Sequence, residues 1–253
     1  MKDESDSGFG LPVGVEAAWG LRERPAKGPK PLLNLDRIVA GAVRIAQAEG
    51  LAAVSMSKVA AEVGVTAMAL YRYVGNKEEL LTLMVDAALG LPPEVPRPGQ
   101  DWRAGLTDWA WAVGESYRRH PWALRVPIGG IPALPNQFAW MDRGLRCLAD
   151  SGLDAQQQLS AILLVSNLVR IYRTIDLDMT QAIEASGRTP DEVMATYAKK
   201  FAVLATPDRF PALSQALATG VLDQADPMDD ELTFGLERVL DGIAVQIARL
   251  AEQ

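Results

Sequence analysis

The sequence predicts an all-helical protein, with an N-terminal three-helix helix-turn-helix domain joined to a larger helical domain. Apolar residues recur at intervals of three and four residues through most of the chain, and no segment alternates apolar and polar residues as a half-buried strand does. Clusters of glycine and proline separate the periodic segments. No internal repeat or low-complexity segment competes with this prediction.

Composition limits the class of protein. With 49% hydrophobic and 23% charged residues among 253, the chain has the composition of a soluble globular protein that can bury a core. The longest apolar run, 161–165, is far shorter than the roughly 20 residues that a membrane span needs. The acidic first ten residues lack the pattern of a secretory signal, so we expect a cytoplasmic protein without membrane contact. A single cysteine, Cys147, excludes an internal disulfide.

The charge of the chain is unevenly distributed. Net charge is −7, but from Arg22 to Lys77 there are nine cationic and only four anionic side chains. A local positive excess matters more for nucleic-acid binding than the total does. The N-terminal third of the chain is therefore compatible with a DNA partner.

Residues 1–33 are expected to form a flexible arm, because their nine glycine and proline residues leave no room for regular structure. Four cations, Arg22, Arg24, Lys27 and Lys30, are spaced along its proline-rich part. Such an arm can lie along a minor groove or a phosphate backbone. A solvated tail without a DNA role is the alternative.

Side chains that can cap a helix precede each of four periodic segments in residues 34–90. The second and third segments are short, and Gly64 between them supplies a turn that other residues form less easily. Asn76 and Glu79 stand three residues apart, like the pair of a capping box, at the start of the fourth segment. The capping residues are Asn34, Ser55, Thr66 and Asn76, and Gly50 and Gly90 end the first and fourth helices.

Four prolines within residues 91–99 mark a domain boundary. The expected parts are thus an arm (1–33), a helix-turn-helix domain (34–90) and a helical domain (91–253). In the last part, periodicity predicts helices near 101–119, 136–150, 154–178, 190–205 and 229–251.

Residues 55–74 have the spacing of a helix-turn-helix. Two helices joined by a tight turn must touch closely while the second projects into the major groove, so fixed offsets require small or apolar residues. Ala60 is small where the helices would cross, and Gly64 stands at the turn. The apolar offsets are filled by Val59, Val63, Val65, Leu70 and Tyr73.

The string from Val54 to Val74, continued by Asn76-Lys77-Glu78-Glu79-Leu80, resembles the DNA-binding domain of TetR/AcrR-family transcriptional regulators. A looser similarity continues through residues 120–124 and 234–238. The resemblance implies a ligand-responsive transcriptional regulator, in most members a repressor that binds a palindromic operator in double-stranded DNA as a homodimer. A small-molecule effector would release it.

Position in the motif assigns the expected DNA contacts. The exposed start of the third helix carries short or apolar side chains, which suit thymine methyl groups and DNA shape, and Arg72 is the expected guanine reader. Two tyrosines and Lys77 match family positions that contact phosphates, and Lys58 adds another phosphate contact. The alternatives are that Tyr73 is only a core residue and Lys77 only solvated. The expected DNA-binding residues are Lys58, Thr66, Ala67, Met68, Ala69, Tyr71, Arg72, Tyr73 and Lys77.

The helical domain contains enough aromatic residues to line an apolar pocket with a few polar groups, which would suit a partly apolar effector. His120, before Pro121, stands where the family links the sensor to the reading head, so it can relay ligand binding; a helix-boundary histidine without that role is the alternative. Most of the aromatic residues can equally be ordinary core. The expected ligand-binding residues are Trp109, His120, Trp122, Trp140, Asn167, Arg170 and Tyr197.

Two of the expected helices resemble the pair that forms the four-helix dimer interface in the TetR family. The helix near 154–178 is apolar on nearly all sides, so both of its faces must be covered. The helix near 229–251 has a continuous apolar stripe, with Gly235 and Gly242 one heptad apart. A purely intramolecular bundle is the alternative.

No catalytic, cofactor or metal site is expected. One cysteine, one histidine and no phosphate-binding glycine loop leave little catalytic machinery. The acidic residues Asp226, Asp229, Asp230 and Glu231 precede a helix, where carboxylates complement the helix dipole more often than they hold a metal. The remaining alternative is a helical small-molecule-binding protein, or an enzyme, with a vestigial DNA-binding head.

Overall fold

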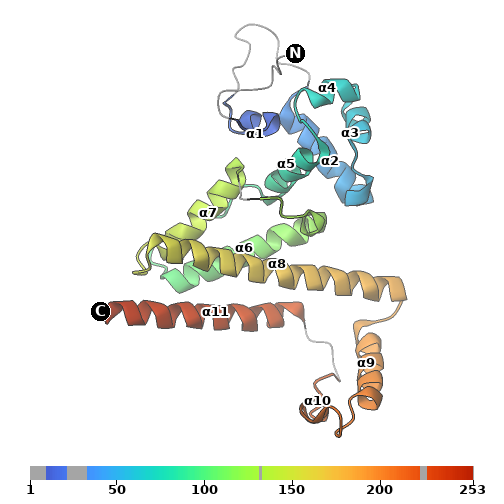
Figure 1. Ribbon diagram of the computed structural model, residues 1–253, viewed down its shortest axis with the longest axis vertical. Helices are drawn as coiled ribbons and strands as arrows, with labels where there is room; N and C mark the ends of the chain where they lie inside the picture. The colour runs from blue at the N-terminus through green and yellow to red at the C-terminus, as the bar shows by residue number, and fades with distance from the viewer. Residues whose placement is uncertain (1–9, 22–32, 131–132, 223–226, 253) are drawn as a thin grey trace. The chain divides into compact units, whose positions relative to one another are not determined.

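The computed structural model of the chain describes residues 10–21, 33–130, 133–222 and 227–252 (Figure 1). In these ranges every regular element is a helix, which confirms the predicted fold class. No helix among them combines the length and the apolar character needed to cross a membrane. The chain divides into two compact units, Met1–Arg170 with Ile243–Gln253, and Ile171–Gly242. The domain boundary expected at residues 91–99 does not coincide with this division and stays a prediction.

Four helices of the first unit form the part that we call the head. They correspond one for one to the four expected between residues 34 and 90. A short 3-10 turn, η1 (Leu51–Ala53), lies between the first two. The head helices are α2 (Leu35–Glu49), α3 (Met56–Val63), α4 (Ala67–Tyr71) and α5 (Lys77–Leu89).

The head helices begin at the predicted caps. Each capping side chain accepts a hydrogen bond from the backbone N–H three residues later, which satisfies one of the free donors of the first turn. The four capping residues are Asn34, Ser55, Thr66 and Asn76. The second half of the predicted capping box is wrong: Glu79 does not return to Asn76, and its carboxylate accepts from the N–H groups of Gly14 and Gly75.

The expectation that residues 1–33 contain no regular structure is wrong for the described part of that segment. Helix α1 (Val13–Ala18) lies against α5 and α2 (Figure 1). Val15 and Glu16 are buried, and Val15 belongs to the core of the head. Tertiary packing stabilises this short helix despite its glycine-rich surroundings. The cations Arg22, Arg24, Lys27 and Lys30 lie outside the described residues.

The head has a closed apolar core. Ile38, Val59, Leu70, Leu80 and Met84 are buried almost completely. The same core includes Trp122 and Leu134 from beyond the proline-rich segment, so the head packs against the rest of the first unit.

We use the term body for the elements of the first unit that follow the head in sequence. These are α6 (Trp102–Arg119), the 3-10 turn η2 (Pro121–Arg125), α7 (Pro135–Leu148), the start of α8 (Ala155–Ser186) and the end of α11 (Met228–Ala251). Close packing joins its helices at Gly144. A Cβ atom there would lie 3.1 Å from atoms of Trp109 on α6 and of Ile162 on α8. A side chain at this position would require these neighbours to move apart by a few tenths of an ångström.

The second unit contains the rest of α8, α9 (Pro190–Leu204), α10 (Pro211–Leu217) and most of α11. Within it, the buried Arg173 joins α8 to α11 through an ion pair with Asp229 at 2.7 Å. Helix α8 continues eight residues beyond its expected end at 178, because no glycine or proline interrupts it before Gly187. The sequence prediction also missed α10.

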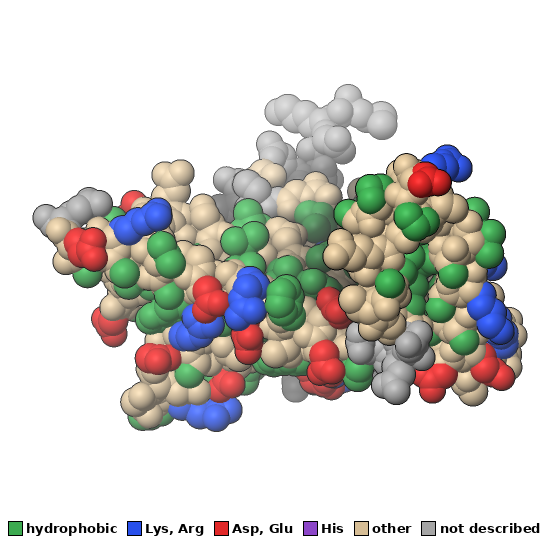
Figure 2. All heavy atoms as spheres, turned by 90° about the horizontal axis from the view of Figure 1, so that it is seen from below, with side chains coloured by type: hydrophobic (Ala, Val, Ile, Leu, Met, Phe, Trp, Pro, Cys, Tyr) green, Lys and Arg blue, Asp and Glu red, His purple; other side chains and the backbone are tan. Residues whose placement is uncertain are grey.

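Helices α8 and α11 expose large apolar side chains within a single chain. Ile162, Val165 and Val169 of α8 are buried, but Leu163 is 62% and Leu164 53% exposed. The exposed apolar residues also include Leu159, Ile171, Ile175 and Met179 on α8 and Phe234 and Val245 on α11. Figure 2 shows hydrophobic side chains reaching the surface between charged ones on the face that it draws. The sequence predicts that both faces of α8 are covered, but in a single chain part of this apolar surface stays exposed to solvent.

Candidate nucleic-acid interface

The α3–α4 turn has the geometry that a helix-turn-helix requires. Gly64 ends α3 with φ 76° and ψ 35°, in the left-handed region that favours glycine. The N–H of Val65 then donates to the carbonyl of Ala60 at 2.9 Å, which closes the turn. Packing of α3 against α2 is equally tight, since a Cβ atom at Gly41 would lie 2.8 Å from Cγ1 of Val63. The expected core-facing residues Val59, Val63 and Leu70 are buried.

Helix α4 presents its start to solvent. Met68 is 76% exposed, Thr66 is exposed, and Ala67 and Ala69 are partly so. Leu70, one turn further, is fully buried. The helix is therefore held by one apolar anchor while its first turn stays accessible, which is the arrangement that entry into a major groove requires.

The residue expected to read guanine, Arg72, and three of those expected to contact phosphates follow the first turn of α4. Tyr71 and Arg72 are exposed, and Lys77 at the start of α5 is partly exposed. Among the described residues, no ion pair involves Arg72 or Lys77. Tyr73 is half-buried, and its hydroxyl donates to the carbonyl of Leu33 at 3.2 Å. That bond must break before the hydroxyl can donate to a phosphate.

Lys58 differs from the other expected phosphate contacts because it already has an anionic partner. Its ammonium is paired with the carboxylate of Glu49 on α2. On the same side of the head, Arg44 pairs with Glu62 at 2.9 Å. Both pairs are exposed, so each contributes little to stability and can exchange its carboxylate for a phosphate at small cost.

The structure brings two of the expected ligand-binding residues together. Trp109 and Trp140 are buried with their rings edge to face at 6.3 Å, and the indole N–H of Trp109 donates to the carbonyl of Trp140 at 3.0 Å. The indole N–H of Trp140 donates to the carbonyl of Gly90, at the end of α5. These bonds satisfy both indole N–H groups and attach the pair to the end of the head helix α5.

His120 and Trp122, also expected in the ligand site, meet Gln47 of the head. The indole of Trp122 donates to Oε1 of Gln47 at 3.2 Å, and Nδ1 of His120 lies 3.3 Å from the same oxygen. Because an amide oxygen only accepts, Nδ1 carries the proton. Burial, and to a smaller extent Arg119, lowers the pKa of His120 below its ordinary value, so the ring is neutral at pH 7. His120 therefore lies beside the head, and its role as a relay of ligand binding stays a prediction.

The three other expected ligand residues do not join these pairs. Arg170 donates to the carbonyls of Leu124 and Val126, which holds η2 against α8. Asn167 is exposed, and Tyr197 belongs to the second unit, where its ring contacts Phe201. A ligand role for the seven residues stays a prediction.

Asp86 of α5 links the head to α7. The N-cap position of α7 is Leu134, whose side chain cannot accept a hydrogen bond. Asp86 takes over this role from another helix, because its carboxylate accepts from the N–H of Gln137 at 2.9 Å and of Asn136 at 3.4 Å. Burial raises the pKa of Asp86 above its ordinary value, while these backbone N–H groups act in the opposite direction.

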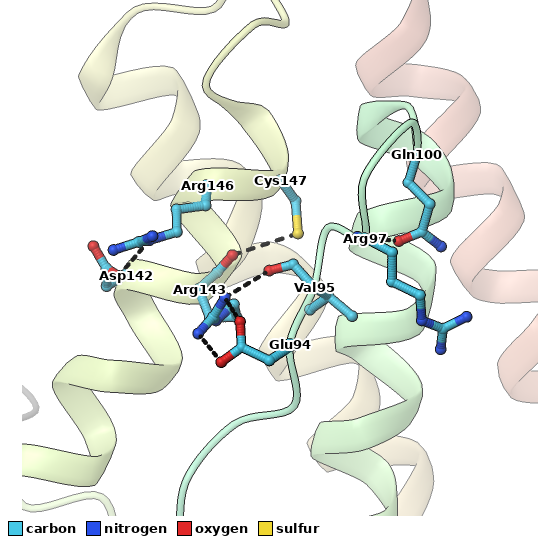
Figure 3. A network of polar contacts seen from close by, with 8 residues as sticks. All are labelled: Glu94, Val95, Arg97, Gln100, Asp142, Arg143, Arg146 and Cys147. Carbon is cyan, nitrogen blue, oxygen red and sulfur yellow. Dashed lines mark hydrogen bonds and ion pairs between the residues drawn. The ribbon is translucent and has the colours of Figure 1, made fainter.

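The proline-rich segment after α5 is also attached to α7 (Figure 3). Arg143 forms a bidentate ion pair with Glu94 at 2.8 and 2.9 Å and reaches the carbonyl of Val95. Cys147, one turn later, donates to the carbonyl of Arg143. Burial raises the pKa of its thiol to about 11, so the thiol is neutral and weakly nucleophilic at pH 7.

Sequence reasoning missed the polar side chains that connect elements: Gln47, Glu79, Asp86 and Arg143. Asp86 alone had a local indication, since it is a carboxylate at an otherwise apolar stretch of α5. No group of histidine, cysteine or carboxylate side chains in the described ranges could hold a metal ion.

Two family models match most of the chain. Residues 38–84 match the family model "Bacterial regulatory proteins, tetR family". Residues 95–247 match "Tetracyclin repressor-like, C-terminal domain". The two matched segments therefore correspond to the head and to the helices that follow it.

Individual relatives agree with these matches. The transcriptional repressor DrrR1 of Streptomyces coeruleorubidus is 37% identical over 241 residues, which are 93% of this chain and 86% of the relative. The tetracycline repressor protein class E of Escherichia coli is 28% identical over 53% of this chain and 64% of its own length. The crystal structure of ActR of Streptomyces coelicolor in complex with actinorhodin has a TM-score of 0.72 at 27% identity, covering 87% of this chain and 99% of that one.

Proposed function

The chain belongs to the TetR family of bacterial regulatory proteins, and we propose that it represses transcription by binding a palindromic operator as a homodimer until a small molecule releases it. It is a ligand-responsive DNA-binding transcriptional regulator, as its relatives are. A protein that reads chromosomal DNA acts in the cytoplasm, and we include that location in the proposal.

One observation carries the DNA-binding part: the capped first turn of α4, with Met68 exposed at its tip, stands on a head whose core is closed. Thr66, Ala67, Met68 and Ala69 would meet base edges, and their short or apolar side chains suit methyl groups and groove shape. Arg72 would read guanine. The phosphate contacts would come from Lys58, Tyr71, Tyr73 and Lys77.

The exposed apolar side chains of α8 and α11 support the homodimer. Leu163, Leu164 and Phe234 are large, and each is more than half exposed in one chain. A second copy would cover them with its own α8 and α11. Gly242 has open space around its Cβ position, which leaves room for a partner helix to approach. The two heads of a dimer would then occupy successive major grooves about 34 Å apart.

The effector would bind among the helices that follow the head. Trp109, His120, Trp122, Trp140, Asn167, Arg170 and Tyr197 are the candidate contacts. Four of them form two aromatic pairs that touch the head at Gly90 and Gln47. A ligand that displaces either pair would favour a head position with a different spacing. The effector and the DNA must then weaken each other's binding by the same factor.

The test is binding of the purified dimer to the duplex upstream of its own gene, measured by fluorescence anisotropy at several salt concentrations. We expect the logarithm of affinity to fall linearly with the logarithm of salt concentration, because phosphate contacts release counterions. Actinorhodin, the ligand in the ActR complex, is the first probe for release. A variant with Arg72→Ala should bind more weakly than the parent.

Two results would contradict parts of this proposal. Salt-dependent binding of equal affinity to the upstream duplex and to unrelated duplexes would show that the protein does not recognise a specific operator. Absence of any DNA binding would favour the alternative, a helical small-molecule-binding protein or enzyme with a vestigial head.

A further inference from the structure

The N-terminal helix α1 contacts two elements that the proposed function assigns to different tasks. Gly14 of α1 contacts α5, the helix that carries Lys77, a proposed phosphate contact. Trp19, at the other end of α1, contacts the start of α7 in the body.

The attachment to α5 is made by Glu79. One carboxylate oxygen accepts from the N–H of Gly14 at 2.5 Å, and the other accepts from the N–H of Gly75 at 2.5 Å. Glu79 is only 9% exposed, so these charge-assisted bonds lie in a low-dielectric environment where they are strong. Gly75 belongs to the turn between α4 and α5, and Lys77 follows two residues later.

The fit of α1 on α5 is tight as well as polar. A Cβ atom at Gly14 would lie 2.7 Å from Cδ1 of Leu83 and 2.8 Å from the carboxylate of Glu79. A side chain at position 14 would therefore require Leu83 or the Glu79 carboxylate to move. Val15, the next residue, is buried in the core of the head.

The attachment to α7 is made by Trp19. Its indole N–H donates to the carbonyl of Ala133 at 2.7 Å, and its ring packs edge to face on Phe138 at 5.2 Å. Ala133 precedes α7, and Phe138 lies in its first turn. Asp86 already ties the same turn of α7 to the later part of α5.

We infer that α1 is a brace that carries a displacement of the start of α7 to the phosphate-contacting end of α5, with Glu79 and Trp19 as the positioning residues at its two ends. This inference rests on the proposed function, because the displacement is the response to effector.

Asp86 and Glu79 are seven residues apart on α5, a distance of about 10 Å along the helix. The later part of α5 is held to the body by Asp86 and by the core that includes Leu134. The bond from Trp140 to Gly90 holds it as well. The first turn of α5, at Glu79, has a second connection to the start of α7 through α1. Both ends of α5 would therefore follow a displacement of α7.

Hydrogen–deuterium exchange of the full-length protein, without DNA or ligand, tests the brace. Trp19→Phe keeps an aromatic ring but removes the N–H donor, and it should accelerate exchange in residues 77–84 of α5 about threefold. Glu79→Gln removes one acceptor, and it should accelerate exchange in residues 134–141 of α7 by a similar factor. Each effect is expected at the end of α1 that the substituted residue does not touch.

Matched controls separate the brace from general loosening. Glu78→Gln makes the same charge change on an exposed neighbour in the same helix turn, and Trp102→Phe makes the same ring change at the start of α6. Neither should alter exchange at the opposite end of α1. If Trp19→Phe and Glu79→Gln change exchange only next to the substituted residue, α1 is two independent anchors and the brace is wrong.

A second readout connects the brace to regulation. Operator affinity of the ligand-free Trp19→Phe variant should stay within about twofold of the parent, whereas the factor by which actinorhodin weakens that affinity should shrink about fivefold. An unchanged factor would overturn the brace. If the parent protein fails to bind operator or ignores actinorhodin, the proposed function loses support, while the exchange experiment still decides the brace.

Discussion

The head and the helix pair α8 and α11 differ in what they leave exposed. The head closes an apolar core around residues such as Ile38 and Leu70 and presents a short helix tip with short or apolar side chains, including the exposed Met68, and neighbouring cations. Helices α8 and α11 bury one set of apolar residues and present another to solvent. The first surface is complete without a protein partner and suits a polyanion, whereas the second is energetically incomplete until another apolar surface covers it.

The largest effect should come from a charge on the exposed face of α8. Leu163→Glu would place a carboxylate in the proposed dimer interface, where its desolvation is expensive. We expect a monomer whose operator affinity is about a thousandfold lower, or about 4 kcal/mol, because one head alone holds half a site. Sedimentation velocity and anisotropy measure the two effects.

The control for this prediction is Leu91→Glu, which changes an exposed leucine away from α8 and α11. It should leave the oligomeric state unchanged. If the parent protein sediments as a monomer at micromolar concentration, the exposed apolar surface of α8 and α11 is not a dimer interface, and the contrast between the two regions is wrong.

Two neighbouring residues of α4 test the contrast within the head. Leu70→Ala should reduce the free energy of unfolding by about 3 kcal/mol, because it empties a fully buried site. Met68→Ala should change stability by less than about 0.5 kcal/mol but weaken operator binding. Urea unfolding and anisotropy distinguish them, and equal loss of stability in both variants would show that the tip of α4 is not a free surface.

Lys77 and Lys58 should differ in the same way on a smaller scale. Lys77→Gln should weaken operator binding about tenfold and reduce the salt slope by about 2, because a dimer loses two phosphate contacts. Lys58→Gln should have a smaller effect on binding, since Lys58 must first leave Glu49. If the logarithm of affinity falls with the logarithm of salt concentration at the same slope for Lys77→Gln and the parent, Lys77 does not contact a phosphate.

His120 should produce the smallest effect, visible only as pH dependence. Its folded pKa is lowered from 6.5, so the folded state binds the proton less readily than the unfolded state. Stability is therefore full above pH 6.5 and declines as the pH falls below it. In thermal melts between pH 7.5 and 5.5, His120→Asn should reduce this decline in stability. If the decline is unchanged in the variant, titration of other groups causes it.

The parts of the head that the sequence predicted depend on local chemistry. Caps such as Asn34 and Thr66 act on N–H groups three residues away, and Gly64 adopts a backbone angle that other residues avoid. The caps and the turn can therefore be predicted from residues that are neighbours in the sequence. The DNA-contact residues could be proposed for the same reason, since the motif is contiguous and its exposed side follows from helical periodicity.

What the sequence missed depends on contacts between distant positions. Poor local propensity predicts an unstructured arm where α1 forms, yet burial of Val15 and Glu16 stabilises this helix. Sequence spacing pairs Glu79 with the nearby cap Asn76, but the Glu79 carboxylate accepts from Gly14, 65 residues away. Asp86 caps a helix that begins about 50 residues later.

By itself, the sequence determined the helical class, the caps and turn of the head helices and the exposure of the start of α4, because each of these is set by residues within about four positions of one another. Only the tertiary structure decided which polar side chains connect distant elements: Gln47 and Asp86 join the head to the body, and Glu79 holds α1 against α5. A hydrogen bond specifies its partner by position in space, and a chain can bring many different distant residues to the same point.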